Sequence, residues 1–142
     1  MKLESVLATK GPRVVTIAGE APVRAAVALL VEHNIGALVV VDAAGAPQGI
    51  LSERDIIRES ARNDRIYDQR AAEVMTRAVV YGSLGDDVEA VLHAMTTHHF
   101  RHLPILDDGA LVGIVSIGDV VKAQLNDYVG SIETLQTQLM NS

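Results

Sequence analysis

The sequence predicts an α/β (α+β) fold made of two repeats, each with the element order β-α-β-β-α. This prediction rests first on self-similarity, because the halves of the chain align when one is displaced by about 65 positions. Within each half, apolar residues first follow a helical spacing and then form two short runs joined by a turn. We therefore expect one module that arose by duplication.

The duplication is clearest in a frame, Gly-x-x-Ser-x-x-Asp, that occurs once in each half. It spans residues 49–55 and 113–119, with Gly, Ser and Asp at the same spacing. Upstream positions agree as well: Val14-Val15, His33, Leu38 and Asp42 align with Val79-Val80, His98, Leu103 and Asp107. Chance similarity does not usually place these residue types at the same spacing inside two apolar frames.

Each half opens on a valine pair and continues into a helix. We expect the first helix near Pro22 and its counterpart at Asp86 or Asp87, because proline suits a first helical turn and Asp can cap exposed N–H groups. Strands are expected at 37–41, 49–51, 103–106 and 111–115, with tight turns at 42–45 and 107–109. A second helix is expected to begin at Asp55 and at Asp119, since a carboxylate is favourable at a helix start.

These elements set the expected boundaries at residues 8–65 for the first repeat, 72–125 for the second and 126–142 for a helical tail. The tail continues an apolar pattern through Val121, Leu125, Val129, Ile132 and Leu139, and Gly130 predicts a break within it. Two roles fit this stripe: it packs on a partner protein, or it covers the apolar surface of its own module.

Composition narrows the possible functions. The chain has 142 residues, 49% of them hydrophobic and 21% charged, which is typical of a soluble globular protein. It lacks cysteine, and the N-terminus lacks the pattern of a secretory signal, so we expect a cytoplasmic location and no membrane partner. The net charge of −6 and the scarcity of aromatic residues argue against a nucleic-acid partner.

The duplicated frame resembles the cystathionine-β-synthase (CBS) domain family, and the segment from Phe100 to Asp119 is especially similar. The resemblance covers roughly Val14 to Val121, and it is closest to small stand-alone bacterial signal-transduction members. It implies that the repeats pack through their sheets with pseudo-twofold symmetry, and that two modules form a homodimeric disc. It also implies a regulatory adenine nucleotide (AMP, ATP or NAD(H)) and an unidentified regulated protein, with no catalytic cofactor.

The Ser and Asp of each frame are candidate nucleotide ligands. A carboxylate can accept both hydrogen bonds of a ribose diol, while a hydroxyl and the first N–H groups of a helix can donate to phosphate. Ser52 and Asp55 would serve a first cleft, and Ser116, Gly118 and Asp119 a second one. The alternative is plain helix capping by these residues.

Charged residues distinguish the two halves. Arg101 and His102 precede a strand in the second half only, so we assign them to the second cleft as phosphate ligands and expect the Asp119 cleft to be the better nucleotide site. A salt bridge between Arg101 and a surface acid is the alternative. Arg54 would supply charge to the first cleft, or would form a solvated pair with Glu53.

The resemblance further implies that each cleft borrows residues from the other repeat. By this carry-over, Thr16, Ile35 and Gly36 would line the second cleft. Thr76, Val80 and Tyr81 would line the first.

Three other functions were weighed. His98 and His102 would share a face of a helix and could bind zinc, but Phe100 and the following strand spoil that spacing, so we expect no metal site. No phosphate-binding loop or dinucleotide fingerprint appears in the sequence, and we expect no enzymatic activity. A structural scaffold that dimerises with empty clefts remains the main alternative.

Overall fold

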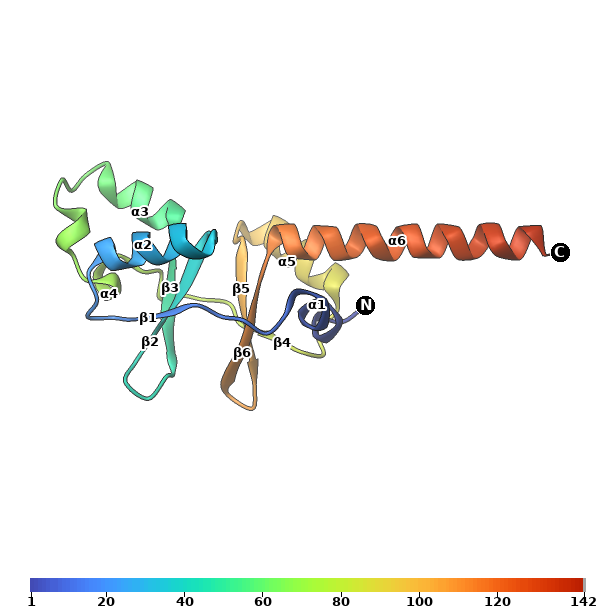
Figure 1. Cartoon of the computed structure of the whole chain (residues 1–142), viewed down its shortest axis with the longest axis horizontal. Helices are drawn as coiled ribbons and strands as arrows, with labels where there is room; N and C mark the ends of the chain where they lie inside the picture. Colours follow the sequence, from blue (N-terminus) through green and yellow to red (C-terminus); the bar gives the residue numbers. More distant parts are fainter. Residues whose placement is uncertain (142) are drawn as a thin grey trace.

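The computed structural model describes residues 1–141 and contains two separate three-stranded sheets (Figure 1). The first sheet holds β1 (Thr16–Ala18), β2 (Ala37–Val41) and β3 (Pro47–Ser52), and the second holds β4 (Gly82–Ser83), β5 (His102–Asp107) and β6 (Ala110–Ser116). In both sheets the first strand pairs in parallel with the second, and the second pairs antiparallel with the third. The duplicated order inferred from the sequence is therefore confirmed.

Four principal helices complete the two repeats: α2 (Val23–His33), α3 (Glu53–Ser60), α5 (Val88–His98) and α6 (Ile117–Met140). The predicted starts of the first helix in each repeat are confirmed, because Pro22 and Asp87 are the N-cap residues of α2 and α5. Within residues 1–141, no helix is both long enough and apolar enough to cross a membrane.

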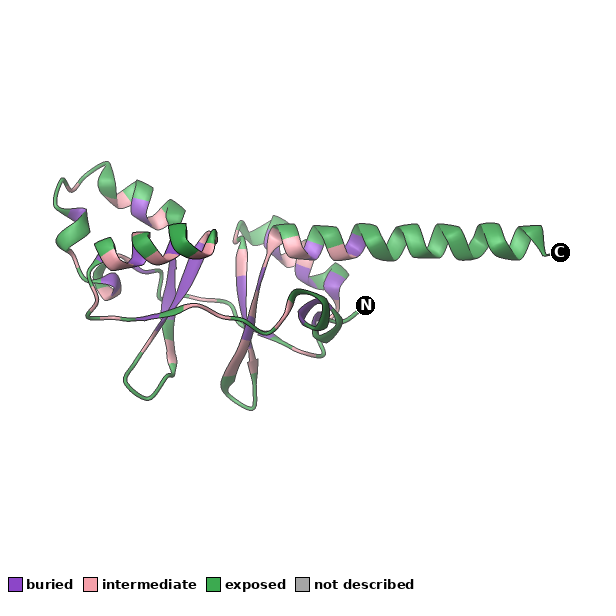
Figure 2. Ribbon diagram, in the orientation of Figure 1, coloured by how far each residue is buried: buried purple, intermediate pink, exposed green. Residues whose placement is uncertain are grey.

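Each repeat has its own hydrophobic core, to which both the helices and the strands contribute buried residues (Figure 2). In the first core Val23 and Leu30 of α2 pack against Leu38 and Leu51 of the sheet. In the second core, Val88 and Met95 of α5 occupy the matching place. The helical apolar spacing thus identified the buried positions Val23, Leu30, Val88 and Met95, but Val31, which fits the same spacing, is 76% exposed.

Two short helices were not predicted from the sequence. Each packs on the core of the other repeat than the one nearest to it under the expected boundaries. α1 (Leu3–Lys10) precedes the first repeat but buries Leu3, Val6 and Leu7 in the core of the second. α4 (Ala71–Val74) follows a single 3₁₀ turn, η1 (Ile66–Asp68), and packs on the first core through Ala71. The N-terminal helix consequently packs in the core of the second repeat.

Several expected boundaries differ from the structure. β1 and β4 begin after the valine pairs, and α3 and α6 begin at Glu53 and Ile117, two residues earlier than predicted. The helices start earlier because the serine of each frame is the N-cap, which places the Asp at the third helical position. The predicted break at Gly130 was wrong, since α6 is continuous; one glycine costs a helix only about 1 kcal/mol.

Candidate functional site

Both frames form the same capping box at a strand-to-helix junction. In the first, the backbone N–H of Ser52 donates to Oδ2 of Asp55 over 2.9 Å, and the N–H of Asp55 donates to the Ser52 hydroxyl over 3.2 Å. In the second, the equivalent distances between Ser116 and Asp119 are 2.8 and 3.1 Å. The capping alternative is therefore real in both repeats, although each carboxylate keeps further lone pairs for other donors.

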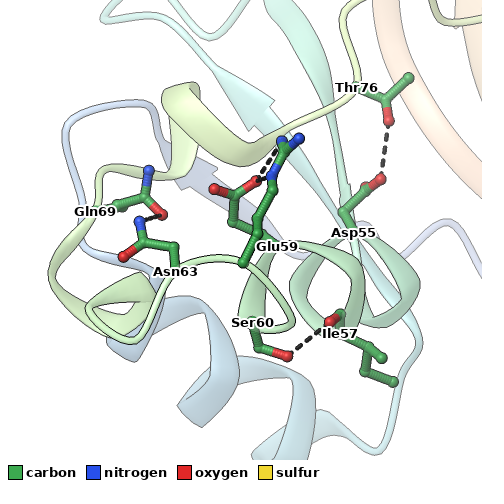
Figure 3. Close-up of polar contacts among 8 residues, drawn as sticks. Asp55, Ile57, Glu59, Ser60, Asn63, Gln69 and Thr76 are labelled. Atoms are coloured by element: carbon green, nitrogen blue, oxygen red, sulfur yellow. Dashed lines mark hydrogen bonds and ion pairs between the residues drawn. The ribbon is translucent and has the colours of Figure 1, made fainter.

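Asp55 has an additional partner from the segment that leaves the first repeat. The Thr76 hydroxyl donates to Oδ1 of Asp55 over 3.0 Å, as Figure 3 shows. The Thr76 backbone also exchanges hydrogen bonds of 3.0 and 2.8 Å with Ile50 of β3. The absence of a side chain at Gly49 permits this approach, because a Cβ there would lie 2.6 Å from the Thr76 carbonyl oxygen.

A cavity of about 640 Å³ opens beside Asp55, and both repeats contribute to its walls. Its volume lies within the usual range for small-molecule pockets. Its lining residues are Ile50, Ser52, Glu53, Arg54, Asp55, Ile57, Arg58, Thr76, Ala78, Val79, Val80, His98, His99, Phe100, Arg101 and His102. Of the residues predicted for the first cleft, only Tyr81 lies outside this lining.

The charge of this cavity opposes the charge of the whole chain. Three arginines and three histidines line it, against the two carboxylates of Glu53 and Asp55. The chain as a whole carries a net charge of −6. Arginines converging on one hollow, with apolar atoms of Ile50 and Val79 nearby, favour a ligand that combines an anionic group with a flat apolar part.

Arg101 and His102, which we expected in the second cleft, line the cavity that contains Asp55. The Arg101 main chain does stay beside its own repeat, because its carbonyl accepts a 2.8 Å hydrogen bond from the N–H of Ile117. Its side chain contributes instead to the wall shared with the first repeat. The side chain of Arg101 is thus available to a ligand in the cavity of the first frame, although its main chain lies beside the second.

Asp119 is engaged by Lys10, a residue that the sequence analysis missed. The Lys10 ammonium lies 2.6 Å from Oδ2 of Asp119 and 2.7 Å from the carbonyl oxygen of Ile114. Burial acts to raise the pKa of Asp119, but the hydrogen bonds from Lys10 and Ser116 and the charge of Lys10 outweigh it and lower the pKa. Nothing in the repeat alignment signalled Lys10, because it belongs to the unpredicted helix α1.

His102 lies between the two clefts. A Cβ at Gly36 would be 3.2 Å from Nε2 of His102 and 3.5 Å from the Glu53 carboxylate, so the glycine leaves room for the imidazole. Burial is the main cause that lowers the pKa of His102, and the charges of Lys10 and Arg101 act in the same direction. The neutral imidazole is accordingly the favoured form at this junction.

The other residues predicted for the second cleft are spread over separate hollows. Thr16 lines a cavity of about 650 Å³ between the two hairpins, together with Gly45 and Gly109. Gly118 lines a hollow of about 440 Å³ on the first turns of α6. Ile35 packs against the first core.

The zinc alternative finds little support in the backbone geometry. His98 is the last residue of α5, His99 has a left-handed backbone, and His102 opens β5, so the pair does not share a helical face. Across residues 1–141, no three acidic, histidine or cysteine side chains form a group able to hold a metal ion.

Comparisons with known proteins agree with this architecture. The chain is 34% identical to the CBS domain-containing protein YhcV of Bacillus subtilis (strain 168), over 93% of this chain and 94% of YhcV. It is 37% identical to the CBS-domain containing protein ATU1752 from Agrobacterium tumefaciens, whose crystal structure matches with a TM-score of 0.84 over 87% of this chain and 99% of that one.

Two similar structures contain adenine-based ligands. The CBS domain protein PAE2072 from Pyrobaculum aerophilum, complexed with AMP, is 26% identical with a TM-score of 0.75, over 84% of this chain and 89% of that one. The CBS domain pair of MJ0100, in complex with 5′-methylthioadenosine and S-adenosyl-L-methionine, is 26% identical with a TM-score of 0.79, over 89% and 98%. Residues 6–62 and 71–126 each match the CBS domain family, and the chain belongs to that family as a tandem pair of CBS domains.

Proposed function

We propose that this protein is a regulatory module that binds an adenine nucleotide, AMP, ATP or NAD(H), in the Asp55 cavity. The observation that carries the proposal is one cavity of about 640 Å³ lined by Asp55 of the first repeat and Arg101 of the second. A carboxylate accepts hydrogen bonds and a guanidinium donates them, so the two groups suit the ribose and the phosphate of one ligand. The AMP complex of PAE2072 supports the same class of ligand.

The lining residues suggest how the nucleotide lies. The ribose diol donates to Asp55, whose present partners Ser52 and Thr76 carry hydroxyl groups that can turn away or accept. The phosphates lie toward Arg101 and Arg54. The adenine packs on Val79 and its apolar neighbours, since aromatic residues are scarce in this chain.

The second cleft is proposed as the weaker nucleotide site. Asp119 already holds the Lys10 ammonium at 2.6 Å, so a ribose would have to displace a charged partner. In the first cleft the side-chain partners of Asp55 are the neutral hydroxyls of Ser52 and Thr76. A charge-assisted hydrogen bond is roughly twice as strong as a neutral one, which favours occupation of the Asp55 cavity first.

The proposed mechanism is a population shift. A ligand that contacts both repeats favours one relative arrangement of them, and a partner protein recognises that arrangement. Regulation and not catalysis is the proposed role, with the chain acting as a homodimer in the cytoplasm.

The test is calorimetric titration of the purified protein with AMP, ATP, NADH and S-adenosylmethionine. We expect heat with at least one nucleotide, an affinity about tenfold or more weaker in Asp55→Asn, and little change in Asp119→Asn. Both variants keep the size of the side chain and differ only in the cleft they alter. Loss of binding in Asp119→Asn alone would reject the choice of cleft.

Absence of heat with all four ligands would reject the nucleotide proposal and favour the scaffold. That alternative draws on a separate observation, the exposed apolar side chains of α6.

A further inference from the structure

The C-terminal two-thirds of α6 extends beyond the folded module into solvent. α6 runs from Ile117 to Met140, and its buried residues are Val120 and Gln124 in the first turns. Every residue from Leu125 to Met140 is exposed. Figure 1 shows the helix projecting from the second repeat, and Figure 2 shows its exposed far part. The part of α6 beyond Gln124 is therefore not covered by the described part of its own chain.

The exposed apolar residues of α6 follow a heptad pattern. Val121, Leu125, Tyr128, Ile132 and Leu135 are separated by alternating steps of four and three residues, and exposed Leu139 is next in the register. These side chains are between 39% and 59% exposed, Leu139 more so. Apolar residues that repeat every 3.5 positions form a straight seam only when two helices wind around each other.

The opposite face of α6 explains why Gly130 is tolerated. With 3.6 residues per turn, Gly130 lies on the side of the helix away from the stripe, as does Thr137. The charged residues beyond Leu125, which are Asp127 and Glu133, also fall outside the stripe. Beyond Leu125 the positions that flank it are Val129, Ser131, Gln136 and Gln138, all uncharged, whereas Lys122 flanks its start beside Val121.

We propose that α6 pairs along this stripe with the α6 of a second copy of the chain. Charges at flanking positions set the choice of partner helix in a coiled coil, and within the described part of α6 only Lys122, at the start of the stripe, is charged at such a position. An uncharged apolar seam is self-complementary, as an isologous twofold contact requires. No like charges oppose each other in such a pair.

The area available also suits a dimer. Burying one aliphatic side chain usually stabilises a protein by about 1.5–3 kcal/mol. At roughly 25 cal/mol per Å², this free energy corresponds to about 60–120 Å² of apolar surface. The stripe residues together then supply on the order of 300–600 Å² per copy, before Val129 and the glutamine stems are added. That approaches the roughly 800 Å² per partner of a standard interface. The contact lies on the projecting helix and is independent of nucleotide binding.

The test is the mass of the full chain in solution, measured by sedimentation equilibrium over a dilution series. The variant is Ile132→Glu at the centre of the stripe, and the matched control is Thr137→Glu on the opposite face of the same helix. Circular dichroism and thermal unfolding check that the folded module is intact in both. We expect Ile132→Glu to halve the mass of the wild type, and Thr137→Glu to leave it unchanged.

Each outcome decides the proposal. A fall from dimer to monomer, or from tetramer to dimer, supports pairing through α6. A monomeric wild type, an unchanged mass in Ile132→Glu, or a fall by a factor other than two would overturn it. If Ile132→Glu unfolds the module, Leu135→Ser provides a milder change at the same seam, and the same masses are compared.

Discussion

The two clefts of this protein share one local design and differ in the segment that crosses it. In both, a serine caps a helix and an aspartate closes a capping box. At Asp55 the crossing segment supplies the neutral hydroxyl of Thr76, and at Asp119 it supplies the ammonium of Lys10. The carboxylate of the same frame therefore meets a neutral hydroxyl in one repeat and an internal cation in the other.

The difference arises from where the crossing segment comes from. Thr76 follows α4, and its backbone pairs with Ile50 at the edge of β3. Lys10 ends α1, and its side chain alone reaches the equivalent carbonyl of Ile114. A backbone contact in one repeat has been replaced by a side-chain contact in the other, which teaches that duplication of a frame does not duplicate the environment of its carboxylate.

The largest expected effect is a loss of folding stability when a side chain is added where the crossing segment packs closely on a strand. Gly49→Ala should destabilise the protein by about 3 kcal/mol, because the new Cβ would lie 2.6 Å from the Thr76 carbonyl oxygen, which is backbone. Gly113→Ala should cost less, about 1–2 kcal/mol, since its new Cβ meets both methyl carbons of the buried Leu7 side chain at 2.7 Å, and a side chain of a short helix can shift more readily than backbone. Urea unfolding of both variants measures the contrast, and equal losses would contradict it.

The next effect concerns ligand charge in the Asp55 cavity. Arg101→Ala should weaken AMP binding by about 10- to 100-fold, because one or two charge-assisted hydrogen bonds to phosphate are lost. Adenosine, which lacks phosphate, should bind the variant and the wild type equally. The control is Arg24→Ala, which removes an arginine that pairs with Asp68 outside the cavity. Equal weakening of AMP and adenosine would show that Arg101 acts on the shape of the cavity and not on phosphate.

Much of the fold was predictable because the elements of each repeat form through interactions between residues that are close in sequence. The apolar faces of α2 and α5 follow helical spacing, and the turn at Asp42 uses its carboxylate to accept the N–H groups of Ala44 and Ala46. Such features need only neighbours in sequence. The short helix α1 lacked this signal, since its order depends on Leu3 and Leu7 entering a core formed by residues far along the chain.

The site was predicted in part for the same reason. The Ser-Asp pairs and Thr76 were identified, because a motif or the family resemblance marked them. Which cleft Arg101 enters depends on the packing of one repeat against the other, and sequence proximity carries no information about that. Lys10 was missed because its partner Asp119 lies 109 positions away.

The third effect tests the internal cation of the second cleft. Lys10→Met should lower stability by about 1 kcal/mol at neutral pH, because Asp119 loses a partly buried ion pair. The pKa of Asp119 is lowered in the folded state, so its contribution is present above the ordinary value near 3.9 and is lost as pH falls through the folded pKa. The deficit of the variant should therefore disappear in strong acid.

Urea unfolding at several pH values checks this prediction. Lys122→Met, which removes an exposed lysine of α6, is the control and should show no such pH dependence. AMP affinity should stay within about twofold of wild type in Lys10→Met, because the Asp55 cavity is untouched. A deficit that persists below the folded pKa of Asp119 would mean that Lys10 acts through packing.

The smallest expected effect is on the pH dependence of stability, and it comes from His102, which lies between the two clefts. Burial lowers its pKa in the folded state, so the unfolded chain binds a proton first as pH falls below its ordinary value near 6.5. Stability should decline from there down to the folded pKa, by at most about 1.4 kcal/mol per pH unit. Replacement by Gln should flatten this decline between about pH 8 and 5, whereas His93→Gln, at an exposed position on α5, should leave it in place. If the decline in stability is unchanged in His102→Gln, it comes from the protonation of another group and not from the imidazole of His102.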